Sequence, residues 1–183
     1  MSQVAQDKAK SIVFVGMMGA GKTAIGRVLA DRLGRRFVDS DDAIEDAANL
    51  KISEIFEQYG EPFFRQKEAQ VIQRLLEDEP IVLATGGGAF VNAPTRDLIG
   101  RLGFSIWLTV PIDVLWSRVK DKTHRPLLQI ENPEEALKNL ATERNPSYAL
   151  ADCNIEVPKQ ATIDEACDLV EAKLRLNGIL KAN

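Results

Sequence analysis

A glycine-rich segment of the chain has the residue types and spacing of a phosphate-binding loop. Residues 16–23 read GMMGAGKT and match the pattern GxxxxGK followed by Ser or Thr. The apolar run 12–15 precedes the segment and an amphipathic stretch follows it, so the loop is predicted to join a strand to a helix. Glycines in such a loop let backbone N–H groups curl around phosphates, and the following helix directs its positive end at them.

Residues of this loop have predicted parts in binding a nucleoside triphosphate. Lys22 would place its charge on the β- and γ-phosphates, and the Thr23 hydroxyl would ligate Mg²⁺. The predicted nucleotide-binding set is Gly19, Ala20, Gly21, Lys22, Thr23 and Ala24. The alternative is a glycine-rich turn with an incidental Lys and Thr, which the strand and helix on either side argue against. The motif indicates the ligand but not the reaction.

Carboxylates follow the second predicted strand, residues 36–39, and not the third, residues 81–84, which contains no Asp. Asp39 and Asp41 are two positions apart, so they would project to one side at a strand end. Asp39 would then hold a metal-bound water, and Asp41 would accept the proton of a substrate hydroxyl. The alternative is that Asp41 or Asp42 only caps the next helix.

Three consecutive glycines, Gly86, Gly87 and Gly88, come directly after the third predicted strand. Ligands bind at the carboxyl edge of a parallel sheet, and glycines there allow the backbone to approach a ligand and offer N–H donors. A tight strand-to-helix turn is the alternative interpretation.

Two arginines occupy positions that a surface role does not explain well. Arg65 falls in the first turn of a helix that Pro62 would open, where its charge opposes the helix dipole and a bound carboxylate would offset the conflict. Arg144 comes just before Pro146, at which a helix is predicted to be interrupted. Each of them, taken alone, is more often a solvated surface arginine.

A polar segment with two prolines, residues 121–133, is predicted to be a mobile lid, because long loops of compact domains often are. It contains Arg125, for which a solvated surface arginine is again an interpretation. His124 is the only histidine of the chain and is assigned no role.

Strand and helix patterns alternate along the chain, which argues for a parallel sheet covered by helices on both sides. The predicted strands are 12–15, 36–39, 81–84, 104–110 and 155–157, and the main predicted helices are 22–33, 52–59, one beginning at 62, 95–102, 111–119 and 162–176. The last helix would bury one face made of Ile163, Ala166, Cys167, Val170 and Leu174.

Composition narrows the class of protein. The 183 residues suit one domain, and the 45% hydrophobic and 27% charged residues suit a globular one. A net charge of −4 argues against a general binder of nucleic acid or anionic membranes. No apolar stretch approaches the roughly 20 residues of a membrane span. The two cysteines, Cys153 and Cys167, are expected to be reduced thiols in a cytosolic protein, with one disulfide as the alternative.

Together these segments resemble the shikimate kinases over roughly residues 11–175. The motifs that carry the resemblance are GMMGAGKT at 16–23, DSD at 39–41, FR at 64–65, GGG at 86–88, RPLL at 125–128 and ERNPSY at 143–148. Many families share the phosphate-binding loop, but the ordered set is specific to this one.

The resemblance implies transfer of the γ-phosphate of ATP to the 3-hydroxyl of shikimate, a step toward chorismate and the aromatic amino acids. It implies an α/β P-loop kinase fold with a five-stranded parallel sheet flanked by helices, similar to nucleoside monophosphate kinases. A single domain is expected at 11–177, with a lid at about 117–133 and flexible ends at 1–10 and 178–183. A cytoplasmic monomer is expected, with ATP and shikimate as its small-molecule partners.

The resemblance also assigns roles to residues. Thr23 and Asp39 would hold one Mg²⁺ ion, and Lys22, Asp41 and Arg125 would act in catalysis. Asp41, Arg65, Gly86, Gly87, Gly88 and Arg144 would bind shikimate. Arg118 and the loop around Gln160 would flank the adenine, and Arg125 would swing in to the phosphates with the lid.

Rival functions remain open from the residues alone. Another small-molecule P-loop kinase, acting on gluconate or a nucleoside monophosphate, shares the loop, and gluconate is also a hydroxylated carboxylate. A nucleotide switch or an ATP-driven binding module is a different class. A GTPase would need an N-K-x-D guanine-recognition motif, which the sequence lacks. An ATP-driven binding module would not need the arginine pair and the three glycines.

Overall fold

The computed structural model describes residues 9–120 and 132–181, and its centre is a five-stranded sheet in which all strands are parallel. The strands are β1 (Ser11–Val15), β2 (Phe37–Asp39), β3 (Val82–Ala84), β4 (Gly103–Thr109) and β5 (Cys153–Glu156). They lie in the order β2-β3-β1-β4-β5. The predicted five-stranded parallel sheet is therefore confirmed.

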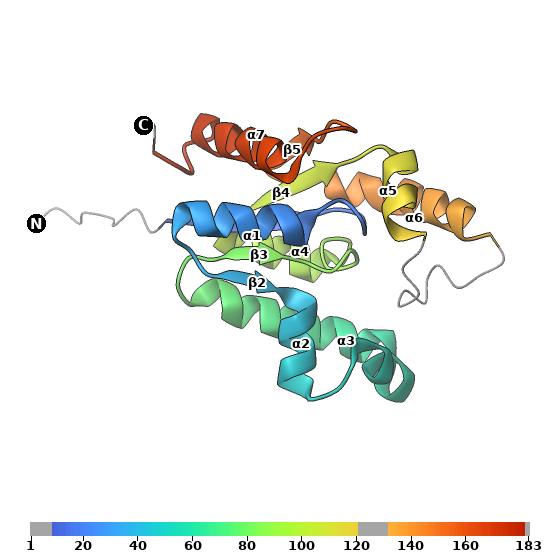
Figure 1. Ribbon diagram of the computed structural model, residues 1–183. Helices are drawn as coiled ribbons and strands as arrows, with labels where there is room; N and C mark the ends of the chain where they lie inside the picture. Colours follow the sequence, from blue (N-terminus) through green and yellow to red (C-terminus); the bar gives the residue numbers. More distant parts are fainter. Residues whose placement is uncertain (1–8, 121–131, 182–183) are drawn as a thin grey trace, which may run out of the picture.

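Helices cover both faces of the sheet, as Figure 1 shows. They are α1 (Lys22–Leu33), α2 (Ser40–Ala48), α3 (Ile52–Glu77), α4 (Ala93–Leu102), α5 (Ile112–Val119), α6 (Pro133–Tyr148) and α7 (Ile163–Leu176). Helices α1 and α7 pack together on one face, and α3 and α4 pack together on the other. Helices α5 and α6 lie beyond one end of the sheet.

The strand order places the topological switch point of the sheet between β1 and β3. The chain leaves β1 through α1 toward β2, and it leaves β3 through α4 in the opposite direction toward β4. Opposite departures from neighbouring parallel strands leave an opening beyond their carboxyl ends, where ligands bind. Residues 16–21 follow β1 and Gly86 to Gly88 follow β3, so both predicted ligand loops meet at this opening.

Burial explains the apolar strand patterns. All five residues of β1 are buried, since helices cover the sheet on both sides. The two cysteines are free and buried, so the alternative of a disulfide is wrong and the prediction that Cys167 belongs to the core is confirmed.

Glycines end helices where the sequence predicts. Gly34 adopts a left-handed conformation (φ 61°) and caps α1. Gly60 (φ 77°, ψ 172°) interrupts the helical geometry of α3, so residues before and after it form two helical pieces in sequence. Pro62 falls in the first turn of the second piece, as expected from its lack of a backbone N–H.

Two local predictions are wrong. Pro146 does not interrupt α6, which runs on to Tyr148, because so near the helix end a missing N–H removes little hydrogen bonding and the Ala149 N–H still bonds to the Asn145 carbonyl (2.9 Å). Ile163 is 48% exposed and does not share the buried face of α7. It is the first residue of the helix, one turn ahead of the first buried position, Ala166.

Packing also extends past the expected domain end at residue 177. Ile179 and Leu180 are partly buried against the core, and Arg175 donates to the Lys181 carbonyl (2.7 Å). Most of the expected lid, including Arg125, lies outside the described residues. Its flanks belong to the end of α5 and the start of α6.

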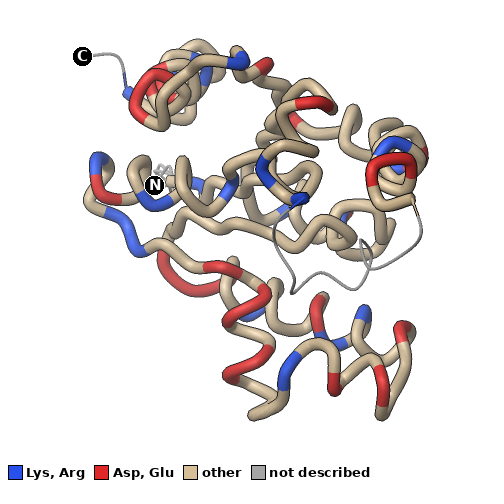
Figure 2. Tube along the Cα trace, turned by 45° about the vertical axis from the view of Figure 1, so that its right-hand side comes forward, with Lys and Arg blue, Asp and Glu red and all other residues tan. Residues whose placement is uncertain are grey.

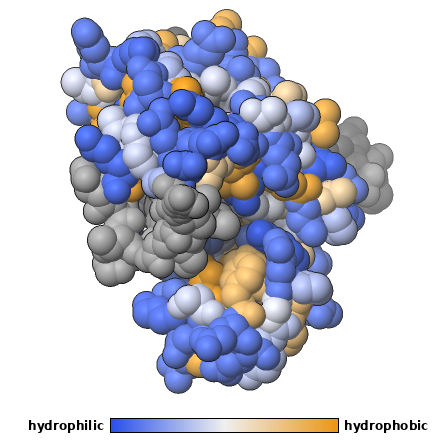
Figure 3. Space-filling model, turned by 90° about the vertical axis from the view of Figure 1, so that its right-hand side faces the viewer, coloured by the Kyte–Doolittle hydropathy of each residue, from blue (hydrophilic) through white to orange (hydrophobic). Residues whose placement is uncertain are grey.

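The surface is largely hydrophilic, and its charges are unevenly distributed. Helix α2 carries four acidic residues and no basic one, which makes it a red segment in Figure 2. On the face shown in Figure 3, an apolar area interrupts the hydrophilic surface in the lower part of the molecule. No helix among residues 9–120 and 132–181 has the length and apolar character needed to cross a membrane.

Candidate active site

The phosphate-binding loop is held in a shape that only glycines adopt without strain. Gly19 (φ 80°) and Gly21 (φ 95°) both lie in the left-handed region. A Cβ at Gly19 would also lie 2.9 Å from the Val119 side chain, so the loop packs directly against α5. Gly21 is the N-cap of α1 and provides no side-chain cap, which leaves the N–H groups of the first turn available to a phosphate.

Lys22 lies along this loop. Its ammonium donates to the carbonyl oxygens of Gly16 and Met17, at 2.8 Å each. These contacts keep the ammonium group against the backbone of the phosphate-binding loop.

Thr23 and Asp39 are joined at the end of the sheet. The Thr23 hydroxyl donates to Asp39 Oδ2 (2.9 Å), which links the first turn of α1 to the last residue of β2. The other oxygen, Asp39 Oδ1, accepts from the Asp41 N–H (3.1 Å) and caps α2. The alternative in which Asp41 or Asp42 is the cap is therefore wrong: the capping residue is Asp39, because α2 begins directly after β2.

The Thr23–Asp39 pair fits a magnesium ion. Hydroxyl and carboxylate oxygens are ligands that Mg²⁺ accepts, and this ion is commonly bound by one or two protein oxygens plus phosphates and water. Within the described part of the chain, no cluster of three or more His, Cys, Asp or Glu side chains could hold a metal. The donor set suits an ion that arrives with a nucleotide better than a permanent metal centre.

The three glycines after β3 each lie against a different charged side chain. A Cβ at Gly86 would be 2.6 Å from Asp41 Oδ1, and one at Gly87 would be 3.0 Å from Arg144 Nη1. A Cβ at Gly88 would overlap Arg65 Nη2. A side chain at any of the three positions would crowd or displace the charged end of one of these residues, which a simple tight turn does not explain.

This loop brings together the residues predicted for the acceptor. Asp41 comes from α2, Arg65 from α3 and Arg144 from α6, and all three meet the loop at the carboxyl edge of the sheet. A hollow of about 820 Å³ opens beside them between α3, α4 and α6, and Arg65, Gly88 and Arg144 line part of it.

Arg65 is held by two carboxylates of its own helix. Its Nη1 donates to Glu68 Oε2 (2.7 Å), while Nε and Nη2 donate to Glu61 Oε1 (3.2 Å each). The Glu68 side chain is 1% exposed and that of Glu61 is 63% exposed. The expected conflict between Arg65 and the helix dipole is thus already offset within α3, before any ligand binds.

Burial sets the electrostatics of this pair. It raises the pKa of Glu68, and the neighbouring Arg65 opposes that rise. Burial acts to lower the pKa of Arg65, but Glu68 and Glu61 outweigh it, so the pKa is raised overall and the guanidinium stays charged. Oxygen Oε1 of Glu68 is the only buried side-chain polar atom of the described residues that has no hydrogen-bond partner.

Sequence reasoning missed two residues of this region. Glu68 stands three positions after Arg65, a spacing at which helical side chains meet, so the pair could have been noticed. Tyr148 donates a hydrogen bond to the Gly87 carbonyl across 61 residues of sequence, and no local pattern signals such a contact.

The two residues predicted to flank the adenine, Arg118 and Gln160, lie on neighbouring segments of the described structure. Arg118 donates to the Gly19 carbonyl (3.0 Å), so α5 borders the phosphate-binding loop. Gln160 is exposed in the turn before α7, and its neighbour Lys159 pairs with Asp113 at the start of α5. This ion pair brings the Gln160 turn alongside the helix that carries Arg118.

Comparison with known proteins decides the family. The sequence model described as shikimate kinase matches residues 18–174. The chain belongs to the shikimate kinase family. It is 53% identical over 154 residues to the shikimate kinase of Cereibacter sphaeroides, covering 84% of this chain and 77% of that protein. It is 50% identical over 165 residues to the shikimate kinase of Ruegeria pomeroyi, covering 90% and 85%.

Solved structures agree with this assignment. The shikimate kinase from Acinetobacter baumannii in complex with shikimate superimposes with a TM-score of 0.85 at 40% identity, covering 98% of both chains. A gluconokinase from Sinorhizobium meliloti 1021 matches with a TM-score of 0.58 at 18% identity, which shows a shared fold only. The predicted P-loop kinase fold is confirmed.

Proposed function

We propose that this shikimate kinase family member transfers the γ-phosphoryl group of ATP to the 3-hydroxyl of shikimate. The observation that carries the proposal is the meeting of Asp41, Arg65 and Arg144 on the three-glycine loop beside the phosphate-binding loop. The Asp41 carboxylate suits a substrate hydroxyl that must lose its proton. The two arginine side chains suit a substrate carboxylate. The structurally similar Acinetobacter baumannii enzyme, with shikimate bound, supports the same acceptor.

On the donor side, backbone groups carry most of the proposed binding. The N–H groups of residues 19–24 would surround the phosphates, and Lys22 would stabilise the charge on the transferred group. Thr23 and Asp39 would hold one Mg²⁺ ion, directly or through water. Bound there, the ion supplies charge neutralisation at the β- and γ-phosphates. Arg118 and Gln160 would flank the adenine.

On the acceptor side, Asp41 would orient the 3-hydroxyl and accept its proton as the oxygen attacks the γ-phosphorus. The bond to the β–γ bridging oxygen breaks, and ADP leaves. Arg65 and Arg144 would clamp the substrate carboxylate, and planar guanidinium groups suit this because they can donate two parallel hydrogen bonds. Positioning and charge neutralisation account for most catalysis of phosphoryl transfer.

The remaining parts of the proposal rest on the resemblance. Arg125, which lies outside the described residues, would close over the phosphates with the lid at about 117–133. The chain would form the single domain of a cytoplasmic monomer, and light scattering of the purified chain would test the monomer.

The function is tested by an ADP-release assay with shikimate, gluconate, AMP or no acceptor. We expect sustained ADP release with shikimate only, and a phosphorus signal coupled to the proton at carbon 3 of the product. Faster turnover of gluconate or AMP would contradict the acceptor assignment and leave only the P-loop kinase fold.

A further inference from the structure

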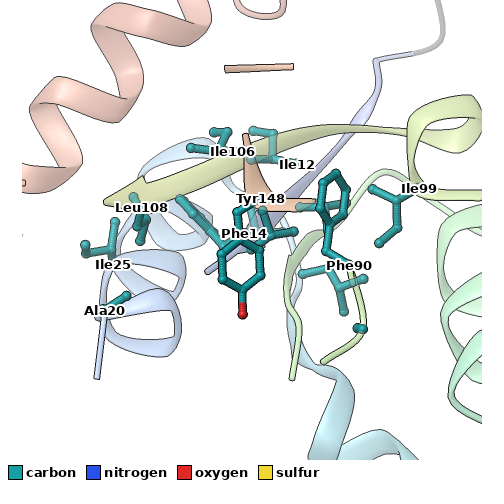
Figure 4. Close-up of a cluster of buried hydrophobic side chains, with 14 of the residues drawn as sticks. Ile12, Phe14, Ala20, Ile25, Phe90, Ile99, Ile106, Leu108 and Tyr148 are labelled. Carbon is teal, nitrogen blue, oxygen red and sulfur yellow. The ribbon is translucent and has the colours of Figure 1, made fainter. Parts of the chain in front are cut away.

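Tyr148 combines a buried ring with a hydroxyl aimed at the active site. It is the last residue of α6 and has no exposed surface. In Figure 4 its ring lies in the cluster of buried side chains, and its hydroxyl oxygen points away from the others. A tyrosine in such a place needs a polar partner for its hydroxyl.

That hydroxyl touches both ligand loops. It donates to the Gly87 carbonyl oxygen in the three-glycine loop (2.5 Å) and lies 3.9 Å from the Met17 sulfur in the phosphate-binding loop. The Trp107 ring, with its centroid 6.0 Å from that of Tyr148, packs against Gly16 at the start of the same loop. The phenol group therefore stands where the donor and acceptor sides of the site meet.

Tyr148 also contacts the arginine proposed to hold the substrate. Arg144 precedes it by four positions on α6, so their side chains share one helix face. The Arg144 guanidinium lies beside the Tyr148 hydroxyl and acts on its pKa, and a Cβ at Gly87 would lie 3.0 Å from Arg144 Nη1 and 3.6 Å from Tyr148 Oη. Arg144, Tyr148 and Gly87 form one contact group.

The bond to Gly87 fixes the direction of a donor. In a trans peptide the carbonyl oxygen and the next N–H point in opposite directions. Because the Gly87 carbonyl points at the Tyr148 hydroxyl, the Gly88 N–H points away from that hydroxyl. Within residues 9–120 and 132–181, neither the Gly87 nor the Gly88 N–H donates to a protein acceptor. Both donors are left for a ligand.

The hydroxyl is kept in its donating form. Burial raises the pKa of Tyr148, and the charged groups that oppose this are Arg144 on its own helix and Arg65 on α3. The phenol therefore remains protonated at neutral pH.

We propose that Tyr148 is a positioning residue for the acceptor. Its hydroxyl orients the Gly87–Gly88 peptide and positions the Arg144 guanidinium, so that the backbone N–H donors and the cation can bind the same ligand. The inference deepens the proposed function and rests on it. It concerns acceptor binding, and it predicts little effect on ATP.

The first experiment compares Tyr148→Phe with Tyr59→Phe, which removes the hydroxyl of the only other tyrosine, a residue 52% exposed and stacked on Phe63. Losing one neutral hydrogen bond should raise the shikimate KM of Tyr148→Phe about 3–10-fold and leave the ATP KM unchanged. Tyr59→Phe should leave both constants unchanged. Equal rises in both constants, or no rise, would overturn the proposal, since a merely structural role would not separate the two substrates.

A double variant tests whether Tyr148 acts on shikimate binding through Arg144 or independently of it. In an Arg144→Ala background, Tyr148→Phe should raise the shikimate KM clearly less than it does in the wild type, because the group that it seats is gone. Equal fold-changes in both backgrounds would contradict seating of Arg144.

A third measurement does not depend on the folding of Tyr148→Phe. In Tyr59→Phe protein grown with 3-fluorotyrosine, the fluorine lowers the pKa of the one remaining phenol while ring and hydroxyl stay in place. The rise of the shikimate KM with pH should then begin at a lower pH than in unlabelled Tyr59→Phe, and coincident profiles would contradict the proposal. Failure of the proposed function would look different, because wild-type protein would then not phosphorylate shikimate at all.

Discussion

The donor and acceptor sides of the site are built in opposite ways. The phosphate-binding part of the donor side is one continuous segment, residues 16–23, whose proposed binding groups are mostly backbone N–H groups and whose shape depends on glycines with positive φ. The acceptor side gathers single side chains from α2, α3 and α6 around one loop. Its arginine at position 65 is already balanced by Glu61 and Glu68.

This difference has a physical consequence. A backbone site is carried by local conformation, so a change elsewhere in the core should disturb it little. An assembled site depends on several long-range contacts at once, and each of them can be broken separately. Substitutions on the two sides should therefore affect different substrates.

The largest effect is expected at Asp41, which belongs to the acceptor side. Asp41→Asn keeps the size of the side chain and removes its basicity, and the loss of a general base lowers kcat by about 10²–10⁴-fold. Steady-state kinetics with titration of ATP binding checks this, since nucleotide affinity should survive. A fall in ATP affinity with unchanged kcat would instead place Asp41 on the donor side.

The next effect is expected at the two arginines. Arg65→Ala or Arg144→Ala should weaken shikimate binding about 10–150-fold, because a hydrogen bond to a charged group contributes roughly 1.5–3 kcal/mol. Lys should not fully restore either position, since it lacks the planar fork. Calorimetric titration with shikimate and with ATP measures both affinities, and a loss that is equal for the two ligands would contradict separate sites.

Two glycine substitutions, one in each loop, should have similar, moderate effects on different substrates. Gly19→Ala introduces strain at φ 80° and a contact with Val119, whereas Gly88→Ala pushes on Arg65. We expect the first to raise the ATP KM about 10-fold, for backbone strain of roughly 1–3 kcal/mol, and the second to raise the shikimate KM to a similar extent by displacing Arg65. Gly34→Ala, at a helix end far from either loop in sequence, is the control. Identical kinetic changes in the two test variants would remove the distinction.

The smallest effect concerns the pH dependence of stability through Tyr148. Burial raises its pKa in the folded protein, so the unfolded chain ionises first as pH rises. The stability from this group is complete below about pH 10, the ordinary pKa of tyrosine, and is lost as pH rises through the folded value. Phenolate absorbance of folded Tyr59→Phe should appear above that ordinary range. Ionisation at or below it would show that the hydroxyl is not buried.

The sequence predicted the local structure around the phosphate-binding loop, because the determinants of that structure are local. The GxxxxGK pattern, the strand before it and Gly34 as the end of α1 all appear within a short window. The five strands were placed to within two residues at each end for the same reason. Apolar runs between glycines and prolines specify buried strands without reference to the rest of the fold.

The acceptor side was predicted as a set of residues but not as an arrangement. Asp39, rather than Asp41, caps α2, since only the structure shows how closely the helix follows the strand. Pro146 stays inside α6. The free-energy cost of a proline in a helix depends on its distance from the helix end, and the sequence did not show where α6 ends. Tyr148 is part of the ERNPSY motif, but no role was assigned to it, because its partner Gly87 lies 61 residues away in sequence.

The central claim is that Arg65 and Arg144 hold one and the same carboxylate. Binding of shikimate and of an analogue that lacks the carboxylate should be measured calorimetrically on the wild type, Arg65→Ala, Arg144→Ala and the double variant. We predict that the double variant loses less shikimate affinity than the sum of the single losses, and that all four proteins bind the analogue about equally. Strictly additive losses, with weaker binding of the analogue to each arginine variant, would show that the two residues act on different parts of the ligand.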